Sequence, residues 1–196
     1  MIIGLTGSIA MGKSEVAKIL RSLNIPVFDA DATVHQIYED GTAAKVLSAI
    51  CPEAIEGKTI NRKILSALIA KNQALLKSIT NSIHPIVNAA EQKFRIENLG
   101  YLAVIDSPLI LESGRARDVD LLIVISAHPE IQKARALARP GMTLEKFKLI
   151  TSKQMPDEEK RAWADYVIEN NGTLEELEVT TKALLDHIKA QAIPDA

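Results

Sequence analysis

The chain has 196 residues, of which 47% are hydrophobic and 24% are charged, and its formal net charge is −2. This length fits one domain, or one domain with an inserted segment, and it needs no disulfide or metal to build a stable core. The near-neutral charge excludes a strongly basic protein that binds nucleic acid mainly through phosphate contacts. The one cysteine, Cys51, cannot form an internal disulfide. That is typical of a reducing compartment, so a cytoplasmic location is expected.

The sequence also lacks the patterns of a membrane protein or a zinc protein. Its apolar stretches are far shorter than the roughly 20 residues that span a bilayer, and its N-terminus lacks the basic segment of a secretory signal. The four histidines lie far apart from one another and from Cys51, so no zinc or iron site is expected. We therefore expect neither a nucleic-acid partner nor a membrane partner.

Short apolar runs alternate with helical patterns along the chain. The runs predict strands at residues 2–6, 26–28, 101–105, 121–125 and, more weakly, 165–168. Helical spacing of apolar residues predicts helices at 14–23, 62–70 and 174–188, with one or two more within 73–99. Continuous apolarity and β-branched residues indicate strands buried on both faces. The pattern predicts an α/β fold with a doubly wound, parallel, five-stranded sheet.

A phosphate-binding motif follows the first predicted strand. Residues 7–14 read Gly-Ser-Ile-Ala-Met-Gly-Lys-Ser, which completes the pattern G-x-x-x-x-G-K-[ST] between a strand and an amphipathic helix. Glycines let backbone N–H groups face the phosphates, and the N-terminus of the helix adds a positive dipole. Lys13 is expected to reach the β- and γ-phosphates, and the Ser14 hydroxyl to ligate Mg²⁺. The sheet is thus predicted to be of the P-loop kinase type, although the loop alone fits an ATPase equally well.

Two carboxylates come directly after the second predicted strand. Asp29 and Asp31 lie at the sheet edge where ligands bind in open α/β folds. A phosphoryl acceptor needs a group that takes the proton of its hydroxyl and holds that hydroxyl in line. We expect Asp29 to fill this role and to bind the acceptor. We expect Asp31 to support it or to contact the substrate, or else to cap the helix that begins near Ala32.

The segment between the second and third predicted strands carries no strand pattern. A crossover in such a sheet needs little more than about a dozen residues, so residues 30–98 are expected to form a helical insertion. This insertion could clamp a bulky phosphoryl acceptor, or it could be an addition to the core with no role in binding. The nucleotide core would then comprise residues 1–29 and 99–196 of a single domain.

Further charged residues follow the third and fourth predicted strands. Asp106 ends the third strand and could position Mg²⁺ or water, or form a turn before Ser107 and Pro108. Arg135 and Arg139 share one face of a predicted helix that leads into a lid at about residues 138–156. They could clamp transferring phosphates or lie on a solvated basic face.

At this point the sequence resembles the dephospho-coenzyme A kinase family nearly from end to end. The phosphate loop is shared by many nucleotide kinases, whereas the later motifs are far more specific in this order and spacing. The residues that carry the resemblance are GLTGSIAMGKS, VFDAD, INR ending at Arg62, His84-Pro85, IDSPLILESG, QKARALARPGMT, Lys153-Gln154, Lys160, Ala164-Asp165 and Ile168–Gly172.

The resemblance implies an enzyme that transfers the ATP γ-phosphate to the ribose 3′-hydroxyl of dephospho-coenzyme A, with ATP and Mg²⁺ required. It implies that Gly7 and the residues from Ala10 to Glu15, Met11 and Gly12 among them, bind ATP phosphates. It implies that Asp29 is the base and that Arg135 and Arg139 are phosphate clamps, with Asn171 near the adenine. Arg62, His84 and Glu112 would have substrate-side or structural roles, and His84 before Pro85 could also mark the end of a helix.

Four residues depart from the family pattern. Ser8 and Ala10 stand where glycines are usual, Glu15 where threonine is usual, and Leu111 where phenylalanine is usual. Ser8 and Ala10 fit a phosphate cradle provided that neither needs a left-handed backbone. Glu15 is favourable at a helix N-terminus, and Leu111 would alter a pocket wall. The alternatives to a kinase of dephospho-coenzyme A are another P-loop nucleotide or small-molecule kinase and a non-catalytic ATP-binding module.

Overall fold

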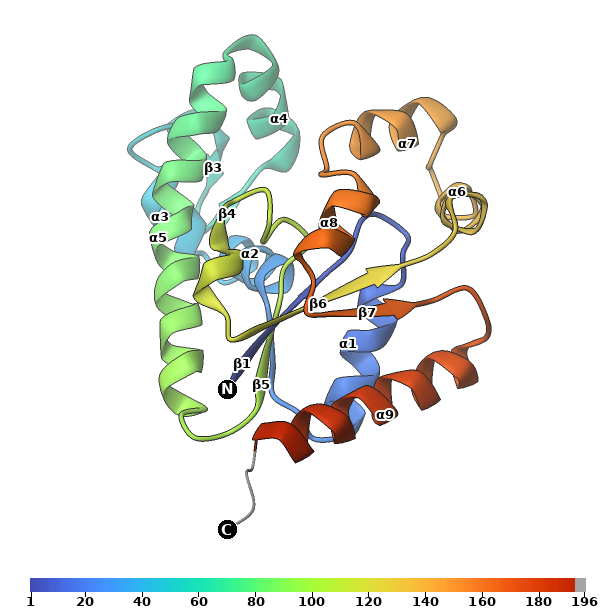
Figure 1. Ribbon diagram of the computed structural model, residues 1–196. Helices are drawn as coiled ribbons and strands as arrows, with labels where there is room; N and C mark the ends of the chain where they lie inside the picture. Colours follow the sequence, from blue (N-terminus) through green and yellow to red (C-terminus); the bar gives the residue numbers. More distant parts are fainter. Residues whose placement is uncertain (193–196) are drawn as a thin grey trace. The chain divides into compact units, whose positions relative to one another are not determined.

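The computed structural model describes residues 1–192 and contains the predicted parallel sheet (Figure 1). The order of its strands is β2-β5-β1-β6-β7. These strands are β1 (Ile2–Thr6), β2 (Val27–Asp29), β5 (Ala103–Asp106), β6 (Leu121–Ser126) and β7 (Tyr166–Glu169). Strand β1 lies between β5 and β6 and pairs in parallel with both, and β6 pairs in parallel with β7. The predicted fold class, a doubly wound five-stranded sheet, is confirmed.

The predicted strand boundaries agree with the observed ones to within one or two residues. The largest shift is at β5, which begins at Ala103 rather than at residue 101. Tyr101 is 68% exposed, and its carbonyl accepts a hydrogen bond from the N-terminal amino group of Met1. It therefore lies before the point where the strand enters the sheet.

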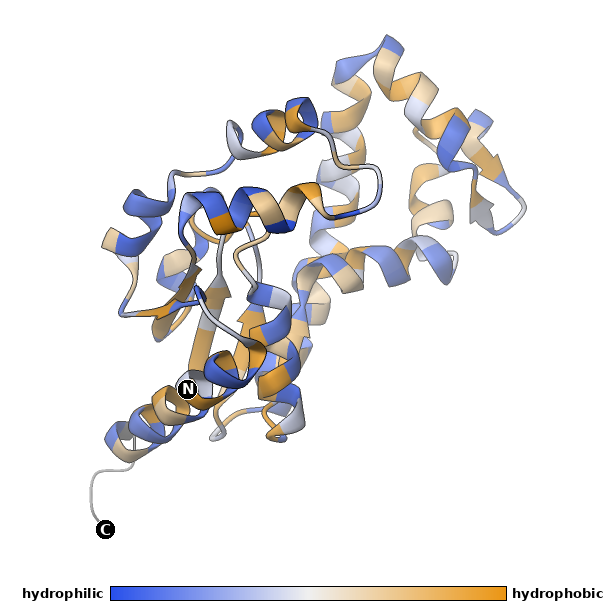
Figure 2. Cartoon of the chain, turned by 90° about the vertical axis from the view of Figure 1, so that its right-hand side faces the viewer, coloured by the Kyte–Doolittle hydropathy of each residue, from blue (hydrophilic) through white to orange (hydrophobic). Residues whose placement is uncertain are grey.

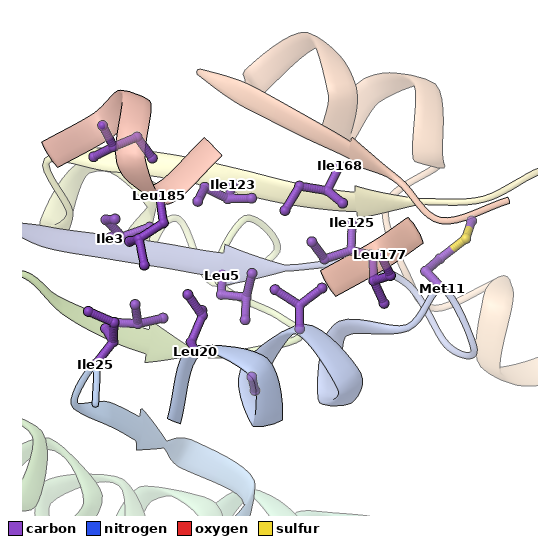
Figure 3. Packing of buried hydrophobic residues seen from close by; sticks show 14 of the residues in the cluster. Ile3, Leu5, Met11, Leu20, Ile25, Ile123, Ile125, Ile168, Leu177 and Leu185 are labelled. Atoms are coloured by element: carbon purple, nitrogen blue, oxygen red, sulfur yellow. The ribbon is translucent and has the colours of Figure 1, made fainter. Parts of the chain in front are cut away.

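One face of the sheet is covered by helices α1 (Lys13–Ser22) and α9 (Leu174–Ala192). Figure 3 shows Leu20 of α1 and Leu177 and Leu185 of α9 packed against side chains of β1, β6 and β7. All three leucines are buried, and each buried side chain of this size contributes roughly 1.5–3 kcal/mol. This packing fixes the strand ends that carry the phosphate loop.

A second hydrophobic cluster contains the side chains of β6 that point to the opposite face of the sheet from those in the first cluster. Leu122 and Val124 pack with Ile110 and Leu111, because successive side chains of a strand point to opposite faces. Leu111, which stands where the family usually has phenylalanine and was expected to alter a pocket wall, is 7% exposed and packs in this cluster. These elements belong to a compact unit formed by residues 1–28 and 98–192. Its remaining elements are a short 3₁₀ turn (Arg115–Asp118), α6 (Pro129–Leu137), α7 (Leu144–Thr151) and α8 (Asp157–Trp163). The expected lid, residues 138–156, thus includes α7.

Residues Asp29–Glu97 form a second compact unit. Its bounds differ by one residue at each end from those of the insertion predicted at residues 30–98. Its elements are α2 (Ala30–Glu39), α3 (Thr42–Leu47), a 3₁₀ turn (Pro52–Ala54), β3 (Ile55–Glu56), β4 (Thr59–Ile60), α4 (Arg62–Lys71) and α5 (Gln73–Glu97). Strands β3 and β4 pair in an antiparallel hairpin, which the sequence analysis missed. Each strand has only two residues, too few to show an alternating pattern.

Helix α5 runs through Pro85 without a break. The suggestion that His84 and Pro85 mark a helix boundary is therefore wrong. A proline in a helix removes one backbone hydrogen bond, but Ile79, Ile83 and Val87 are buried on either side of it. Their packing carries the helix past Pro85.

Figure 2 shows the strands of the sheet as predominantly hydrophobic, whereas the helices are striped along their length. Strands buried on both faces and amphipathic surface helices produce this contrast. No helix within residues 1–192 combines the length and apolarity needed to cross a lipid bilayer.

Candidate functional site

The phosphate loop joins β1 to α1, and close approaches fix its two ends. A Cβ atom on Gly7 would lie 2.7 Å from the carbonyl oxygen of Ile125. Gly12 has a φ of 104°, and a Cβ there would lie 2.0 Å from Nδ2 of Asn170. Both positions therefore require glycine, and the loop is held tightly against the ends of β6 and β7.

Ala10 adopts a left-handed backbone with a φ of 62°. A phosphate cradle was expected to accept Ser8 and Ala10 in place of glycine only if neither had a left-handed backbone. Ala10 does not meet this condition, whereas Ser8 has no positive φ and does meet it. For an L-residue this conformation costs roughly 1–2 kcal/mol. The clamped ends of the loop impose it, because the chain must turn between Gly7 and Gly12 to enter α1.

The first turn of α1 supplies the positive groups of the loop. The N–H groups of Glu15 and Val16 donate to the carbonyl of Gly12 at 3.0 and 3.2 Å, so those of Lys13 and Ser14 are the ones that can face a phosphate, and the helix dipole adds positive potential there. Ser14 is exposed in this turn. Glu15 forms a 2.8 Å ion pair with Lys18 on the side of the helix.

Lys13 forms an ion pair with Asp106, the last residue of β5. The Asp106 side chain is 2% exposed and that of Lys13 is 14% exposed. The hydroxyl of the buried residue Thr6 donates a hydrogen bond to the carbonyl of Pro108 at 3.3 Å. The ends of β1 and β5 thus bring together the two residues predicted to handle phosphate and metal.

The segment after β7 supports the loop from the other side. Asn170 Nδ2 donates to the carbonyl of Met11 at 2.9 Å, and Asn170 is itself 5% exposed. Arg135 Nη1 donates to the carbonyl of Asn170 at 2.8 Å, and Nη2 lies 3.4 Å from the carbonyl of Gly172. Arg135 therefore holds the backbone of this segment, whereas Arg139 is exposed beyond the end of α6. Their roles toward phosphate remain predictions.

Two glutamines hold the peptide groups on either side of Ile9 in the phosphate loop. The Ile9 N–H donates to Oε1 of Gln154 at 3.0 Å, and Gln132 Nε2 donates to the Ile9 carbonyl at 2.9 Å. Gln154 lies within the segment predicted to be a lid, so the position of that segment is linked to the conformation of the loop. The sequence pointed to neither contact. Its only signals were that Gln132 begins one of the family motifs and that Gln154 lies within another.

A pocket of about 430 Å³ lies beside the loop and is lined by residues that include Met11, His128 and Asn171. The His128 N–H donates to Oδ1 of Asn171 at 2.7 Å. On the same wall, Arg161 and Glu169 form a 2.7 Å ion pair, and the Arg161 guanidinium lowers the pKa of Glu169. A pocket of this volume is in the range of small-molecule sites. Asn171, predicted to lie near the adenine, thus forms part of a pocket wall.

A buried ion pair connects the segment after β5 to helix α8, which follows the predicted lid. Lys160 is fully buried, and its Nζ lies 2.9 Å from Oε1 of Glu112 and 3.3 Å from the Pro108 carbonyl. The N–H of Met155 donates to the same Glu112 oxygen at 2.9 Å. Burial alone would raise the pKa of Glu112, but the hydrogen bonds from Lys160 and Met155 outweigh it and lower that pKa. Glu112 thus has a structural role in this ion pair, and its contact with the substrate stays a prediction.

In the second unit, Asp29 ends β2 and is the N-cap of α2. Its Oδ1 accepts a hydrogen bond from the N–H of Ala32 at 2.9 Å. The capping role that the sequence suggested for Asp31 is thus filled by Asp29, while Asp31 is exposed and lines a pocket with Arg62. His84 is exposed on α5. The structure therefore places Asp31 and Arg62 together, as two of the predicted substrate-binding residues.

The residues around Lys13 offer hard oxygen donors for a metal ion. They are the Ser14 hydroxyl and the Asp106 carboxylate, which suit Mg²⁺. Residues 1–192 contain no group of three or more His, Cys, Asp or Glu side chains that could hold a metal. This donor set fits an ion that is held through one or two protein groups and through phosphate oxygens, as Mg²⁺ commonly is.

The strain at Ala10 predicts an unusual response to glycine. Replacing Ala10 with Gly removes the left-handed penalty but adds about 0.4–1 kcal/mol of unfolded-state entropy. We expect the free energy of unfolding of Ala10→Gly to equal or exceed that of the wild type in urea titrations. The matched variant Gly12→Ala should be strongly destabilised, because its Cβ would overlap Asn170. A clear loss of stability in Ala10→Gly would show that the loop does not strain this residue.

The Glu112–Lys160 pair predicts a pH-dependent effect. Because the pKa of Glu112 is lower in the folded state, its charge stabilises the fold at neutral pH, and this contribution is lost as the pH falls through the lowered value. Glu112→Gln leaves the Lys160 ammonium buried without its partner and should cost about 3 kcal/mol at pH 7. Urea unfolding at several pH values should show this difference shrinking below about pH 4. A difference that stays constant with pH would contradict the assignment.

Comparison with known proteins identifies the family. The family model described as dephospho-CoA kinase matches residues 1–176. A dephospho-CoA kinase of Novosphingobium aromaticivorans is 44% identical over 190 residues, which cover 96% of this chain and 94% of that protein. A crystal structure from Thermus thermophilus aligns with a TM-score of 0.81 and 34% identity over 95% of this chain and 97% of the other. The dephospho-CoA kinase from Campylobacter jejuni aligns with a TM-score of 0.72 and 27% identity over 98% of both chains. The chain belongs to the dephospho-CoA kinase family.

Proposed function

We propose that the chain transfers the γ-phosphate of ATP to the 3′-hydroxyl of the ribose of dephospho-CoA, which gives CoA and ADP in the last step of CoA synthesis. Family membership identifies it as an ATP-dependent kinase of this kind. The observation that supports the proposal most directly is the phosphate loop, whose Lys13 lies against Asp106 at the carboxyl ends of β1 and β5. The use of ATP and the free, buried thiol of Cys51 fit the expected cytoplasmic location.

The donor half of the reaction uses the loop and the first turn of α1. Backbone N–H groups and the Lys13 ammonium bind the phosphates and offset the charge on the group being transferred. Ser14 and Asp106 would hold Mg²⁺, which when bound neutralises charge on the β- and γ-phosphate oxygens. Arg139, exposed at the base of the lid, would add a second cation once the lid closes.

The lid residues would exclude water from the transferred phosphate. Gln154 contacts the loop through the Ile9 N–H, and Glu112 holds Met155 next to it. A change at the phosphates is therefore transmitted to the lid through a short set of hydrogen bonds. Excluding water prevents ATP hydrolysis in place of transfer.

The acceptor half depends on Asp29. Its carboxylate would accept the proton of the 3′-hydroxyl and hold the attacking oxygen in line. The hydrogen bond from the N–H of Ala32 fixes the orientation of this carboxylate at the start of α2. Asp29 therefore does not depend on a flexible loop for its position.

Asp29→Asn tests the proposed base without removing the helix cap. Asparagine caps helices as well as aspartate does, so α2 should persist while the proton acceptor is lost. We expect kcat with dephospho-CoA to fall by about 10²–10⁴-fold, whereas the dissociation constant for ATP stays within about twofold of the wild type.

Asp40→Asn is the matched control. Asp40 lies at the other end of α2, and its Oδ1 accepts the N–H of Thr42 at 2.8 Å, a backbone contact comparable to that of Asp29 with the Ala32 N–H. This variant should retain its turnover. Turnover of Asp29→Asn close to that of Asp40→Asn would contradict the role given to Asp29.

A further inference from the structure

The side chain of Gln154 carries two amide N–H donors beside the phosphate loop. Its Oε1 accepts the N–H of Ile9 at 3.0 Å. Because only the oxygen of a carboxamide can accept that N–H, this contact fixes which way the carboxamide faces. Within residues 1–192, Nε2 of Gln154 donates to no protein group and is not enclosed by protein atoms. Its two N–H bonds are therefore accessible to a ligand that enters the loop.

The backbone around Gln154 is held on both sides. Its own N–H donates to the carbonyl of Thr151, the last residue of α7, at 3.2 Å. The next residue, Met155, donates its N–H to Glu112 at 2.9 Å, and Glu112 is paired with the buried Lys160. An anchored segment thus presents the carboxamide, and donors that are fixed in advance stabilise charge without rearrangement.

The peptide groups of Ile9 are used by two glutamines. Gln154 accepts the Ile9 N–H, and Nε2 of Gln132 donates to the Ile9 carbonyl at 2.9 Å. Backbone N–H groups are the usual phosphate ligands of such a loop, but the N–H of Ile9 is already bonded. Gln154 therefore takes up one donor of the loop and offers the two N–H bonds of its own amide beside it.

The place of Gln154 in the chain favours the terminal phosphate as the group that accepts these donors. Lys13 and the first turn of α1 follow Ile9 by four or more residues, whereas Gln154 comes from the predicted lid. In the proposed reaction the lid would exclude water from the phosphate being transferred. A lid residue that reaches the loop would then adjoin that phosphate, whose oxygens share the charge of the transition state.

We propose that Gln154 binds the γ-phosphate of ATP through Nε2 while its Oε1 stays on the Ile9 N–H. One backbone donor of the loop is in this way replaced by two amide donors from the predicted lid. The assignment rests on the proposed function, because it takes ATP as the phosphoryl donor, but it does not depend on which acceptor is used.

Calorimetric titration with ATP and with ADP, in the presence of Mg²⁺ and without an acceptor, tests the assignment. Gln154→Met keeps the length of the side chain but removes its donors and its acceptor. The Kd for ATP should rise by about tenfold or more, as expected for a lost hydrogen bond to a charged group. The Kd for ADP, which lacks the γ-phosphate, should rise by no more than about threefold.

Gln154→Glu separates the two ends of the side chain. A carboxylate still accepts the Ile9 N–H, but at neutral pH it has no proton to donate. The Kd of this variant for ATP should therefore rise at least as much as that of Gln154→Met. If Gln154→Glu bound ATP as tightly as the wild type, the side chain would do no more than hold Ile9, and the assignment would be wrong.

Two other glutamines provide matched controls for Gln154→Met. Gln132→Met removes the other contact with Ile9 and should weaken ATP and ADP by the same factor, because Nε2 of Gln132 is engaged by the loop backbone. Gln191→Met removes the hydrogen bond that Tyr166 donates to Gln191 on α9 at 2.9 Å, and it should change neither Kd. Urea unfolding of each variant shows whether it is folded.

The outcomes separate this assignment from the proposed function. If the wild type does not bind ATP, or binds ATP but does not phosphorylate dephospho-CoA, the proposed function is wrong. If the wild type is active and Gln154→Met raises the Kd for ATP and for ADP equally, only the assignment of Gln154 is wrong. An unchanged Kd for ATP in that variant would overturn it as well.

Discussion

The contact between Lys13 and Asp106 is the interaction on which the donor site depends. It joins the phosphate loop after β1 to the end of β5, and the Asp106 side chain is almost fully buried. A buried carboxylate is costly without a partner, so Lys13 is held at the strand ends before any nucleotide arrives. In the proposed reaction, phosphates that enter the loop would meet a cation already in place, and Asp106 with Ser14 would hold Mg²⁺. Preorganised charge of this kind needs no rearrangement during transfer.

The sequence predicted the sheet well because its strands are buried on both faces, which produces continuous apolar runs such as residues 2–6. It also placed Lys13, Ser14 and Asp106 at adjoining strand ends. It missed the hairpin Ile55–Ile60, because two residues per strand give no period. The left-handed Ala10 arises from close approaches at Gly7 and Gly12, and the Gln154–Ile9 hydrogen bond joins residues 145 positions apart. Local sequence patterns predict neither the backbone conformation of Ala10 nor this hydrogen bond.

The two compact units divide the proposed chemistry between them. Residues 1–28 and 98–192 contain the phosphate loop, the predicted lid and the pocket beside Asn171, which in the proposed reaction would serve the phosphoryl donor. Residues 29–97 contain Asp29, proposed to act on the acceptor, and a pocket lined by residues that include Asp31 and Arg62, both predicted to bind it. Asp29 links the two roles, since it is both the last residue of β2 and the cap of α2. A core that binds ATP can in this way serve a particular acceptor through the unit inserted into it.

The most direct test of the account is product analysis of the purified protein incubated with ATP, Mg²⁺ and dephospho-CoA, with AMP as a parallel acceptor. Mass spectrometry and phosphate mapping should find CoA, phosphorylated at the ribose 3′-oxygen, and ADP in equal amounts. Neither should form without Mg²⁺, and AMP should not be phosphorylated. ADP released without CoA, or transfer only to AMP, would contradict the assignment of dephospho-CoA as the acceptor while leaving the phosphate loop as an ATP site.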